Sequence, residues 1–448
     1  MLYFRNILAA VALFFAGSTF AGVSAPSEAE GLTNTPVSDA PGALEALKNA
    51  AEHHDAQALY RLGAVVFEGK RVQKNLEQAA DLFKRAADKD YAPAQNAYGF
   101  MLQHGLGVGS DDQEAARWYA RAANGGNADA QNNLGWLYQE GRGVARNLEQ
   151  AVNWYSKAAA AGSGVAAWNI GRLYESGAYA PNRGSPDVAA ALDWYRKAAA
   201  DGQAMAQYKL GRALLEGKGV ERNPVEGLAW IGKASAQGNP LAQHQLALQL
   251  AGDGYTNRDE REALRLALAA AAQGVPAAGR LAASFLERGV GAAIDPSAAA
   301  RWYREAATRG EAEAALRLAL LLDTGPPELH APAQAATWYE QASIAGWHHA
   351  DWRLGKLYHD GRGVERDYGQ ALKRYQRAAD AGYADALYRI GVLYDEGLGV
   401  ERDSRVALQW YAKAADRGHI EANAVIERLM KPLDRGNDLF GAPKFGKF

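Results

Sequence analysis

The chain has 448 residues, of which 48% are hydrophobic, with 49 basic and 51 acidic side chains. It contains no cysteine, which excludes disulfides, cysteine-ligated zinc, iron–sulfur clusters, cysteine nucleophiles and a lipid anchor on a cysteine. A formal charge of −2 and a pI near 6.5 argue against nucleic-acid binding, which usually relies on a strongly basic domain.

The first residues have the pattern of an export signal. Arg5 precedes an apolar run at 7–17 and a small-residue segment that ends at Ala21. We predict a signal peptide over 1–21, with cleavage after Ala25 as an alternative site. The apolar run is shorter than the roughly 20 residues of a membrane-spanning helix, so we expect no integral membrane span after cleavage; an uncleaved anchor is the alternative. Residues 22–41 are rich in Ser, Thr, Pro and Gly and predict a flexible leader.

A repeat dominates the rest of the sequence. A short alanine-rich phrase ends in glycine at positions 126, 162, 202, 238, 274, 310, 346, 382 and 418, always 36 residues apart except for one gap of 40. This period predicts ten repeats over 58–418. A capping half-repeat at 42–57 precedes them, a capping helix at 419–433 follows, and we expect residues 434–448 to form a flexible tail.

Each repeat predicts two helices. In repeat three, apolar residues at Ala130, Leu134, Leu137 and Tyr138 follow the helical period, and a Gly-x-Gly-Val loop at 141–144 follows them. The second helix then begins at an Asn or Asp that caps its first turn in every repeat except the eighth, where Ala331 occupies this position. The glycine that ends the repeat is expected to adopt the left-handed conformation typical of a helix end.

The repeated pattern resembles the Sel1-like repeat, a relative of the tetratricopeptide repeat. The resemblance rests on the Leu-Gly-x-Leu-Tyr phrase at 134–138, the Gly-x-Gly-Val loop, the Asn or Asp cap and the Trp-Tyr phrase at 154–155, and it covers about 80% of the chain. It implies an all-α, right-handed α-solenoid whose first helices line a concave surface. Repeats five to eight depart from the pattern, as in Trp230-Ile231 and in the loop Gly252-Asp-Gly254-Tyr of repeat six, so the curvature there is harder to predict.

The helical period also predicts an exposed face on the first helices. With Ala130 counted as zero, positions +2, +3, +6 and +9 should face away from the buried stripe. These positions carry aromatic and cationic side chains, which are the types that contribute most binding energy at interfaces. The alternative for the +2 aromatic residues is packing against the neighbouring first helix. The predicted binding face consists of Tyr60, Arg61, Phe100, Trp136, Trp168, Arg172, Tyr208, Lys209, Arg212, Trp352, Arg353, Tyr388 and Arg389.

Other motifs point to structure and not to chemistry. The Gly-x-Gly-Val loops lack the strand and the Lys-Ser/Thr of a phosphate-binding loop, so they are interpreted as turns. The recurring Trp-Tyr pairs are interpreted as repeat core. The histidine cluster of His348, His349 and His359 is too spread for a metal site, because ten residues of helix separate the last two by roughly 15 Å. No Ser-x-x-Lys, His-Glu-x-x-His or nucleophile-elbow motif occurs, and we expect neither catalysis nor a cofactor.

The leading hypothesis is therefore a non-catalytic periplasmic scaffold. It would bind extended or acidic segments of other proteins through the concave face, within an envelope-associated complex. A secreted or surface-exposed protein that engages host molecules is the first alternative. A module that binds an anionic polysaccharide is the second.

Overall fold

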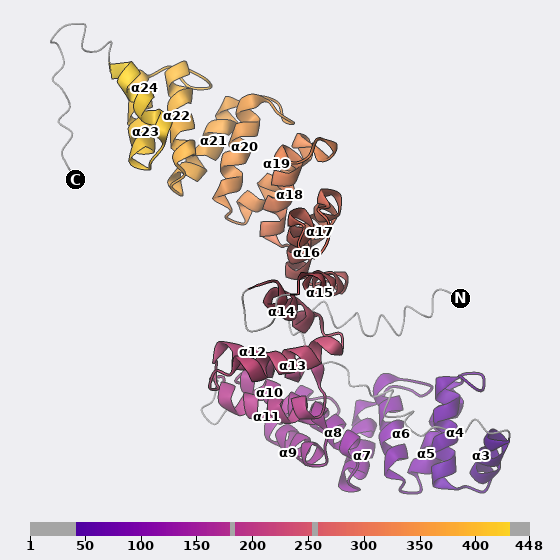
Figure 1. Ribbon diagram of the computed structural model, residues 1–448. Helices are drawn as coiled ribbons and strands as arrows, with labels where there is room; N and C mark the ends of the chain where they lie inside the picture. The colour runs from indigo at the N-terminus through magenta and orange to yellow at the C-terminus, as the bar shows by residue number, and fades with distance from the viewer. Residues whose placement is uncertain (1–41, 180–183, 253–258, 431–448) are drawn as a thin grey trace. The chain divides into compact units, whose positions relative to one another are not determined.

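The computed structural model describes residues 42–179, 184–252 and 259–430 (Figure 1). In these ranges the chain forms 22 α-helices, one short 3₁₀ helix at Pro327–Leu329 and no strand. The predicted signal peptide, leader and C-terminal tail lie outside the described residues. The all-α prediction is confirmed for the part of the chain that the structure describes.

The helices alternate as the sequence predicts. The first helices of the ten repeats are α4 (Ala56–Glu68), α6 (Ala92–His104), α8 (Ala128–Glu140), α10 (Gly164–Glu175), α12 (Ala204–Glu216), α14 (Pro240–Ala251), α16 (Pro276–Arg288), α18 (Ala312–Thr324), α20 (His348–Asp360) and α22 (Ala384–Glu396). The second helices are α5 (Leu76–Ala87), α7 (Asp112–Asn124), α9 (Leu148–Ala160), α11 (Val188–Ala200), α13 (Pro224–Ala236), α15 (Glu260–Ala272), α17 (Pro296–Thr308), α19 (Pro332–Ile344), α21 (Tyr368–Asp380) and α23 (Ser404–Asp416). Helices α3 (Ala43–Glu52) and α24 (Ile420–Met430) precede and follow them.

The second helices begin where the capping residues predict. The Asn147 side chain, for example, accepts a hydrogen bond from the backbone N–H of Gln150, and the carboxylate of Asp367 does the same for Gln370. Ala331, which begins repeat eight's second helix, provides no side-chain cap. An accepting oxygen at this position satisfies an N–H that the first turn leaves unpaired, so nine of the ten second helices have a fixed start.

Two glycines of repeat three show why the pattern needs glycine. Gly143 has a φ of +67°, and a Cβ atom there would lie 2.1 Å from the carbonyl oxygen of Asp112, so the loop rests directly on the preceding second helix. Gly135 lies in the middle of α8, where a Cβ would come within 2.8 Å of the Tyr155 ring. The two helices therefore approach each other closely at Gly135.

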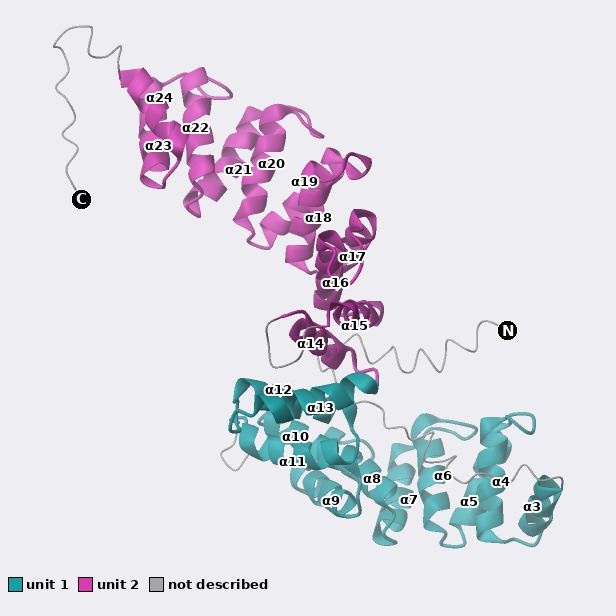
Figure 2. Cartoon of the chain, viewed as in Figure 1, with its two compact units in different colours: residues 1–237 teal, residues 238–448 magenta. Residues whose placement is uncertain are grey.

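The helices form two compact units, residues 1–237 and 238–448 (Figure 2). The first contains α3 to α13 and the second α14 to α24, and within each unit every helix packs against the one before and the one after it. The division falls between repeats five and six, inside the region where the sequence departs from the repeat pattern. No described helix has both the length and the apolar composition that a membrane span requires.

The core of both units combines fully buried alanines and leucines with, in most repeats, one large aromatic residue. Alanines of both helices are fully buried, and most second helices add a tyrosine whose ring is almost completely enclosed. Because alanine lets helix axes approach closely, the tyrosine ring can fill the space between three consecutive helices. These tyrosines are Tyr119, Tyr155, Tyr195, Tyr303, Tyr339, Tyr375 and Tyr411.

Candidate functional site

The aromatic residues at position +2 are mostly buried, which corrects the predicted face. Tyr60 is 5% exposed, Trp168 is 7% exposed and Tyr208 is 9% exposed. Trp352 and Tyr388, at the same position of the last two repeats, are half-buried. The prediction that all five lie on an open face is wrong for the first three.

The reason is the way that consecutive repeats stack. The Tyr60 ring lies between Phe83 of its own second helix and Tyr91 at the start of the next first helix, with ring centroids 5.7 and 5.5 Å away. Trp168 packs in the same way against Tyr195, at 4.9 Å. Burial raises the pKa of the Tyr60 hydroxyl to about 12. Position +2 therefore faces the junction with the following repeat, and its aromatic residues belong to the core.

The half-buried +2 residues of the second unit have partners of their own. The Tyr388 ring stacks on His419, with centroids 4.2 Å apart and planes 10° from parallel. Trp352 lies 5.4 Å from the His349 ring, and the Arg353 guanidinium lies over its face at 4.6 Å. A guanidinium over an indole is a favourable cation–π arrangement.

Position +6 is the open position of the first unit. Phe100, Trp136 and Arg172 are half-buried and Arg212 is exposed, and they occupy the same place on α6, α8, α10 and α12. We call these four residues the +6 row. Phe100 packs on His104 at 4.4 Å, and Arg212 forms an ion pair with Glu216 at 2.9 Å. The row thus places two aromatic residues beside two cations along four consecutive repeats.

Direct hydrogen bonds hold consecutive first helices of this unit side by side. Asn133 Nδ2 donates to Asn96 Oδ1 at 3.1 Å, and Asn169 Nδ2 donates to Asn132 Oδ1 at 3.0 Å. Both bonds join position +3 of one repeat to position +2 of the repeat before it. The first helices therefore keep a fixed register, and equivalent +6 residues follow one another along one side of the unit.

The cations of position +3 lie beside the tyrosines of the preceding repeat. Lys209 forms an ion pair with Glu175 at 2.6 Å and also lies over the Tyr195 ring. The positive charges of Arg353 and Arg389 act on Tyr339 and Tyr375 in the same sense, opposing the rise in tyrosine pKa that burial causes. Arg61, at the same position of repeat one, is half-buried. The predicted cationic residues are thus partly accessible, and Lys209 is already neutralised.

Position +9 carries a feature that sequence reasoning missed. The residue at position +9 was expected on the exposed face of the first helix. In the structure its side chain accepts a hydrogen bond from the buried tyrosine of the same repeat. The Tyr195 hydroxyl donates to Glu175 Oε2 at 2.7 Å, and the Tyr155 hydroxyl donates to Gln139 Oε1 at 3.1 Å. Equivalent bonds join Tyr119 to Gln103, Tyr303 to Glu287 and Tyr339 to Asp323.

The +9 residue, the tyrosine and the +3 residue of the next repeat vary together, and we call them the tyrosine triad. Among the six repeats that carry the tyrosine and are followed by another full repeat, Gln at +9 is accompanied by Asn at the next +3, and Glu or Asp is accompanied by Lys or Arg. In repeat one Phe83 replaces the tyrosine, and the +9 residue and the +3 residue of the next repeat are both apolar. Only repeat-aligned comparison of these three positions would have found the signal. The triads of repeats two, three, four, seven, eight and nine are Gln103/Tyr119/Asn133, Gln139/Tyr155/Asn169, Glu175/Tyr195/Lys209, Glu287/Tyr303/Arg317, Asp323/Tyr339/Arg353 and His359/Tyr375/Arg389.

The tryptophans of the second helices are less enclosed than predicted. The tyrosine of each Trp-Tyr pair is core, but Trp154, Trp194 and Trp410 are only half-buried. A lysine three residues later covers each ring, with Lys157 Nζ 3.9 Å from the Trp154 centroid. The interpretation of both residues as core is therefore correct for the tyrosines and only partly correct for the tryptophans.

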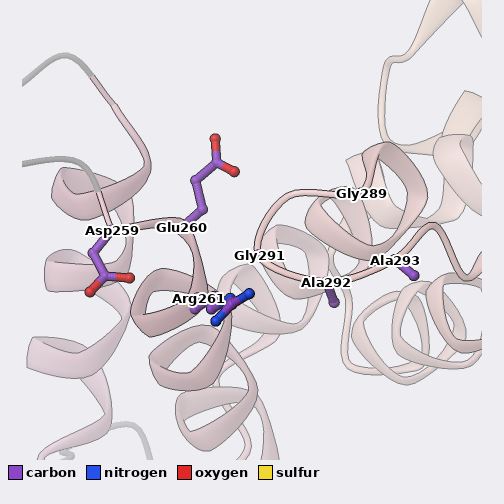
Figure 3. A pocket seen from close by; sticks show the side chains of 7 residues that line it. All are labelled: Asp259, Glu260, Arg261, Gly289, Gly291, Ala292 and Ala293. Carbon is purple, nitrogen blue, oxygen red and sulfur yellow. The ribbon is translucent and has the colours of Figure 1, made fainter.

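A shallow hollow of about 620 Å³ opens between the start of α15 and the loop after α16 (Figure 3). Asp259, Glu260 and Arg261 line one side, and Gly289, Gly291, Ala292 and Ala293 line the other. The Asp259 carboxylate caps α15 by accepting from the N–H of Glu262. The hollow is thus the ordinary junction of a loop with the preceding second helix. In the described part of the chain, no three His, Asp or Glu side chains are grouped as a metal site would need.

Comparison with known families identifies the repeat. The Sel1 repeat matches ten consecutive segments, at 56–91, 92–127, 128–163, 164–203, 204–239, 240–275, 275–311, 312–347, 348–383 and 384–419. These segments contain the ten helix pairs described above. No curated protein matches the chain significantly.

The solved structures that are similar to this chain include two bacterial proteins. A protective antigen of uropathogenic Escherichia coli strains that displays an SLR fold is 27% identical, with a TM-score of 0.61, over 90% of this chain and 99% of its own. A Sel1 repeat protein from Oxalobacter formigenes is 31% identical, with a TM-score of 0.48, over 52% of this chain and 93% of its own. Ten matched repeats, with the helix pairs and glycine turns that they require, show that the chain belongs to the Sel1 repeat family.

Proposed function

We propose that this protein is a non-catalytic adaptor of the periplasm that binds an extended segment of a partner protein along its first helices. Sel1 repeat proteins generally mediate protein–protein interactions, and their solenoid is typically an interaction scaffold. The observation that carries the proposal is the +6 row of the first unit, in which four consecutive repeats each present one accessible aromatic or cationic side chain.

The spacing of the row suits an extended chain. First helices joined by direct side-chain hydrogen bonds, as α6, α8 and α10 are, have axes about 10 Å apart. An extended peptide rises about 3.3 Å per residue, so one repeat corresponds to about three peptide residues. A partner segment could therefore place a side chain on Phe100, Trp136, Arg172 and Arg212 in turn.

Charge and aromatic content define the partner further. Arg172 favours an acidic or polar segment at one end of the row, where Arg212 is paired with Glu216, and Phe100 and Trp136 provide apolar contact at the other. Aromatic residues and arginine lose little conformational entropy relative to the contact area they offer, which is why they dominate binding energies at interfaces. Burial of Tyr60, Trp168 and Tyr208 leaves few rings for stacking on sugars, so a protein segment is favoured over a glycan.

The periplasmic location rests on the sequence of residues 1–21, which has the order of a secretory signal. Fractionation of cells that produce the full chain tests it. Release with the periplasmic fraction, together with N-terminal sequencing that begins at residue 22 or 26, supports the proposal. Retention of the whole chain in the cytoplasm contradicts it.

A crosslinking pull-down from periplasmic extract tests the binding face. The test variant replaces Phe100, Trp136, Arg172 and Arg212 by alanine. The matched control replaces Lys157, Lys197 and Lys233, which cover tryptophans on the second helices of the same unit. Both proteins are first shown by circular dichroism to unfold at temperatures close to that of the wild type.

We expect the wild type and the control variant to recover the same partners and the +6 variant to lose them. Equal recovery by the +6 variant and the wild type would show that the face is not used. Loss of the partners by the lysine control alone would move the binding surface to the second helices.

One observation favours a second candidate. The similar structure from uropathogenic Escherichia coli is described as a protective antigen, and its whole length aligns with this chain. A protein that raises protective immunity must be accessible to the host, so a secreted or surface-exposed role is the alternative. Antibody labelling of intact cells distinguishes the two, because a periplasmic adaptor is labelled only after the outer membrane is opened.

A further inference from the structure

Repeat nine breaks the matching of the tyrosine triads. In repeats four, seven and eight the tyrosine hydroxyl donates to a carboxylate, and the next repeat supplies a cation. Repeat nine keeps the tyrosine, Tyr375, and the cation, Arg389, but its +9 residue is His359. It is the only triad above in which a cation is present without the acid that accompanies it elsewhere.

The consequence for Tyr375 is an unsatisfied buried hydroxyl. Its side chain is 0% exposed, and among the described residues neither its hydroxyl nor His359 Nδ1 has a hydrogen-bond partner. The His359 ring packs edge-on against Tyr368, with centroids 5.4 Å apart, and lies 6.4 Å from the Tyr375 ring. A buried polar group without a partner destabilises the fold, so a ligand that supplies the acceptor gains the free energy of the missing hydrogen bond on binding.

Arg389 is correspondingly left without an acid. No carboxylate of the described residues forms an ion pair with it, whereas Lys209 in the equivalent place lies 2.6 Å from Glu175. Burial lowers the pKa of His359. The negative charges of Asp360 and Glu396 raise this pKa without outweighing burial, and the positive charges of Arg389 and Arg366 lower it further. His359 is therefore neutral near neutral pH and does not repel the Arg389 guanidinium.

The site is reachable along the first helices. His359 and Arg389 are both half-buried, as is Lys356, three residues before His359 on α20. Arg353 on the same helix adds a further cation beside Trp352. Lys356 and Arg389 thus place positive charge at this site, and the carboxylates of Asp360 and Glu396 place negative charge near His359.

We propose that repeat nine is a recognition site for a carboxylate of a partner protein, an acidic side chain that takes the place left by His359 between Tyr375 and Arg389. A carboxylate fits because its two oxygens can accept from both groups at once, as those of Glu175 accept from Tyr195 and Lys209. The inference rests on the proposed function, since it assigns an acidic segment of the partner to one place on the first helices of the second unit.

The sharpest test supplies the carboxylate from the chain itself. His359→Glu restores the arrangement of repeat four, so the internal carboxylate competes with the ligand. The probe is a fluorescent peptide of alternating glutamate and serine, titrated against the full-length protein and followed by anisotropy, with an alternating glutamine and serine peptide for comparison. The matched control is Gln139→Glu, which adds the same charge at the same position of repeat three, beside Asn169.

We expect the wild type and Gln139→Glu to bind the glutamate peptide equally and His359→Glu to bind it at least tenfold more weakly. Arg389→Gln should lose binding to the same extent without a loss of thermal stability, because Arg389 has no ion pair to break. His359→Glu should raise the melting temperature by about 2–4 °C, since the tyrosine and the arginine then gain an acceptor.

Equal binding of the glutamine peptide, equal binding by His359→Glu, or no binding to the wild type would each overturn the proposal. Competition by free sodium glutamate as strong as that of the peptide would also overturn it, in favour of a small-molecule site.

Failure of the carboxylate site can be distinguished from failure of the proposed function. The +6 variant alters only the first unit, and His359→Glu alters only the second. If the +6 variant loses the partner while His359→Glu retains it, the adaptor function stands and the carboxylate site does not. If His359→Glu weakens peptide binding while the +6 variant recovers every partner, the carboxylate site stands and the +6 face does not.

Discussion

Repeats four and nine share one frame and differ in one side chain. Each has a glycine in the first helix against the tyrosine ring of the second, and each receives a cation from the following repeat. Repeat four has Glu175 between Tyr195 and Lys209, and its polar groups are satisfied within the chain. Repeat nine has His359 in the corresponding place, and Tyr375 and Arg389 lack a carboxylate.

The difference shows how a repeat protein can separate stability from recognition. The alanines, glycine and tyrosine ring that hold three helices together are the same in both repeats, so the fold does not depend on the +9 residue. Position +9 therefore decides only whether the polar groups of the junction bond to each other or remain available. Repeat four uses them for stability, and we infer that repeat nine uses them for binding.

The largest expected effect tests the shared frame. Gly171→Val and Gly355→Val place a branched side chain where a Cβ would already lie 2.6 and 2.7 Å from the rings of Tyr195 and Tyr375. Each should lower the free energy of unfolding by about 3 kcal/mol, because the core cannot open to admit the extra atoms. Urea denaturation measures it.

A helical glycine with open space provides the control. A Cβ at Gly232 of α13 meets no atom within 4 Å, so Gly232→Ala should stabilise the protein by about 0.5–1 kcal/mol through helix propensity. If only one of the two valine variants destabilises the protein, the two repeats do not share the frame described here.

The next effect concerns the acid of repeat four. Burial favours a higher pKa for Glu175, but the hydrogen bonds from Lys209 and Tyr195 outweigh it and lower the pKa. Glu175→Ala should cost about 1–2 kcal/mol, a value reduced by the partial exposure of the pair. His359→Gln, which gives repeat nine the acceptor found in repeats two and three, should not destabilise the protein. Equal losses for the two variants in urea would contradict the comparison.

Removal of the tyrosine hydroxyls should show the difference between repeats four and nine more directly, as a difference in stability. Tyr195→Phe loses a hydrogen bond to a carboxylate and should cost about 1 kcal/mol. Tyr375→Phe removes a buried hydroxyl without a partner and should be neutral or slightly stabilising. The difference between the two melting temperatures measures the contrast, and a larger loss for Tyr375→Phe would show that its hydroxyl is satisfied.

The smallest expected effect is on pH dependence. Burial lowers the folded-state pKa of His359, so the unfolded chain binds its proton more readily. The stability associated with the neutral imidazole is therefore present above the unfolded pKa of about 6.5, and it is lost as the pH falls from there to the folded pKa. Because His104, His244 and His349 are shifted in the same direction, only the difference between wild type and His359→Gln isolates this residue. The variant should lose less stability on acidification, and parallel curves would exclude a contribution from His359.

Much of this architecture could be predicted from the order of residues. The 36-residue period, the Asn and Asp caps and the glycine helix ends are local signals, because each depends on backbone groups within one turn of the residue concerned. They predict the helix pairs and the starts of the second helices, such as the one capped by Asn147.

The candidate site was harder to predict, because exposure at one position depends on two neighbouring repeats. The helical period places Tyr60, Trp168 and Tyr208 on the side away from their own helix's buried stripe. It does not show that the next first helix and the second-helix aromatic residue cover that side. Position +9 is a similar case, since Gln139 is polar and yet serves the core through Tyr155.

The sequence by itself thus determined the all-α repeat architecture, the family and the absence of cysteine chemistry, since these depend on composition and on patterns within single repeats. Only the tertiary structure decided which aromatic residues are core, which +6 and +3 residues are accessible, and where a polar group lacks its partner. Those properties arise from contacts between residues about 16 to 37 positions apart in the chain, which no helical period encodes.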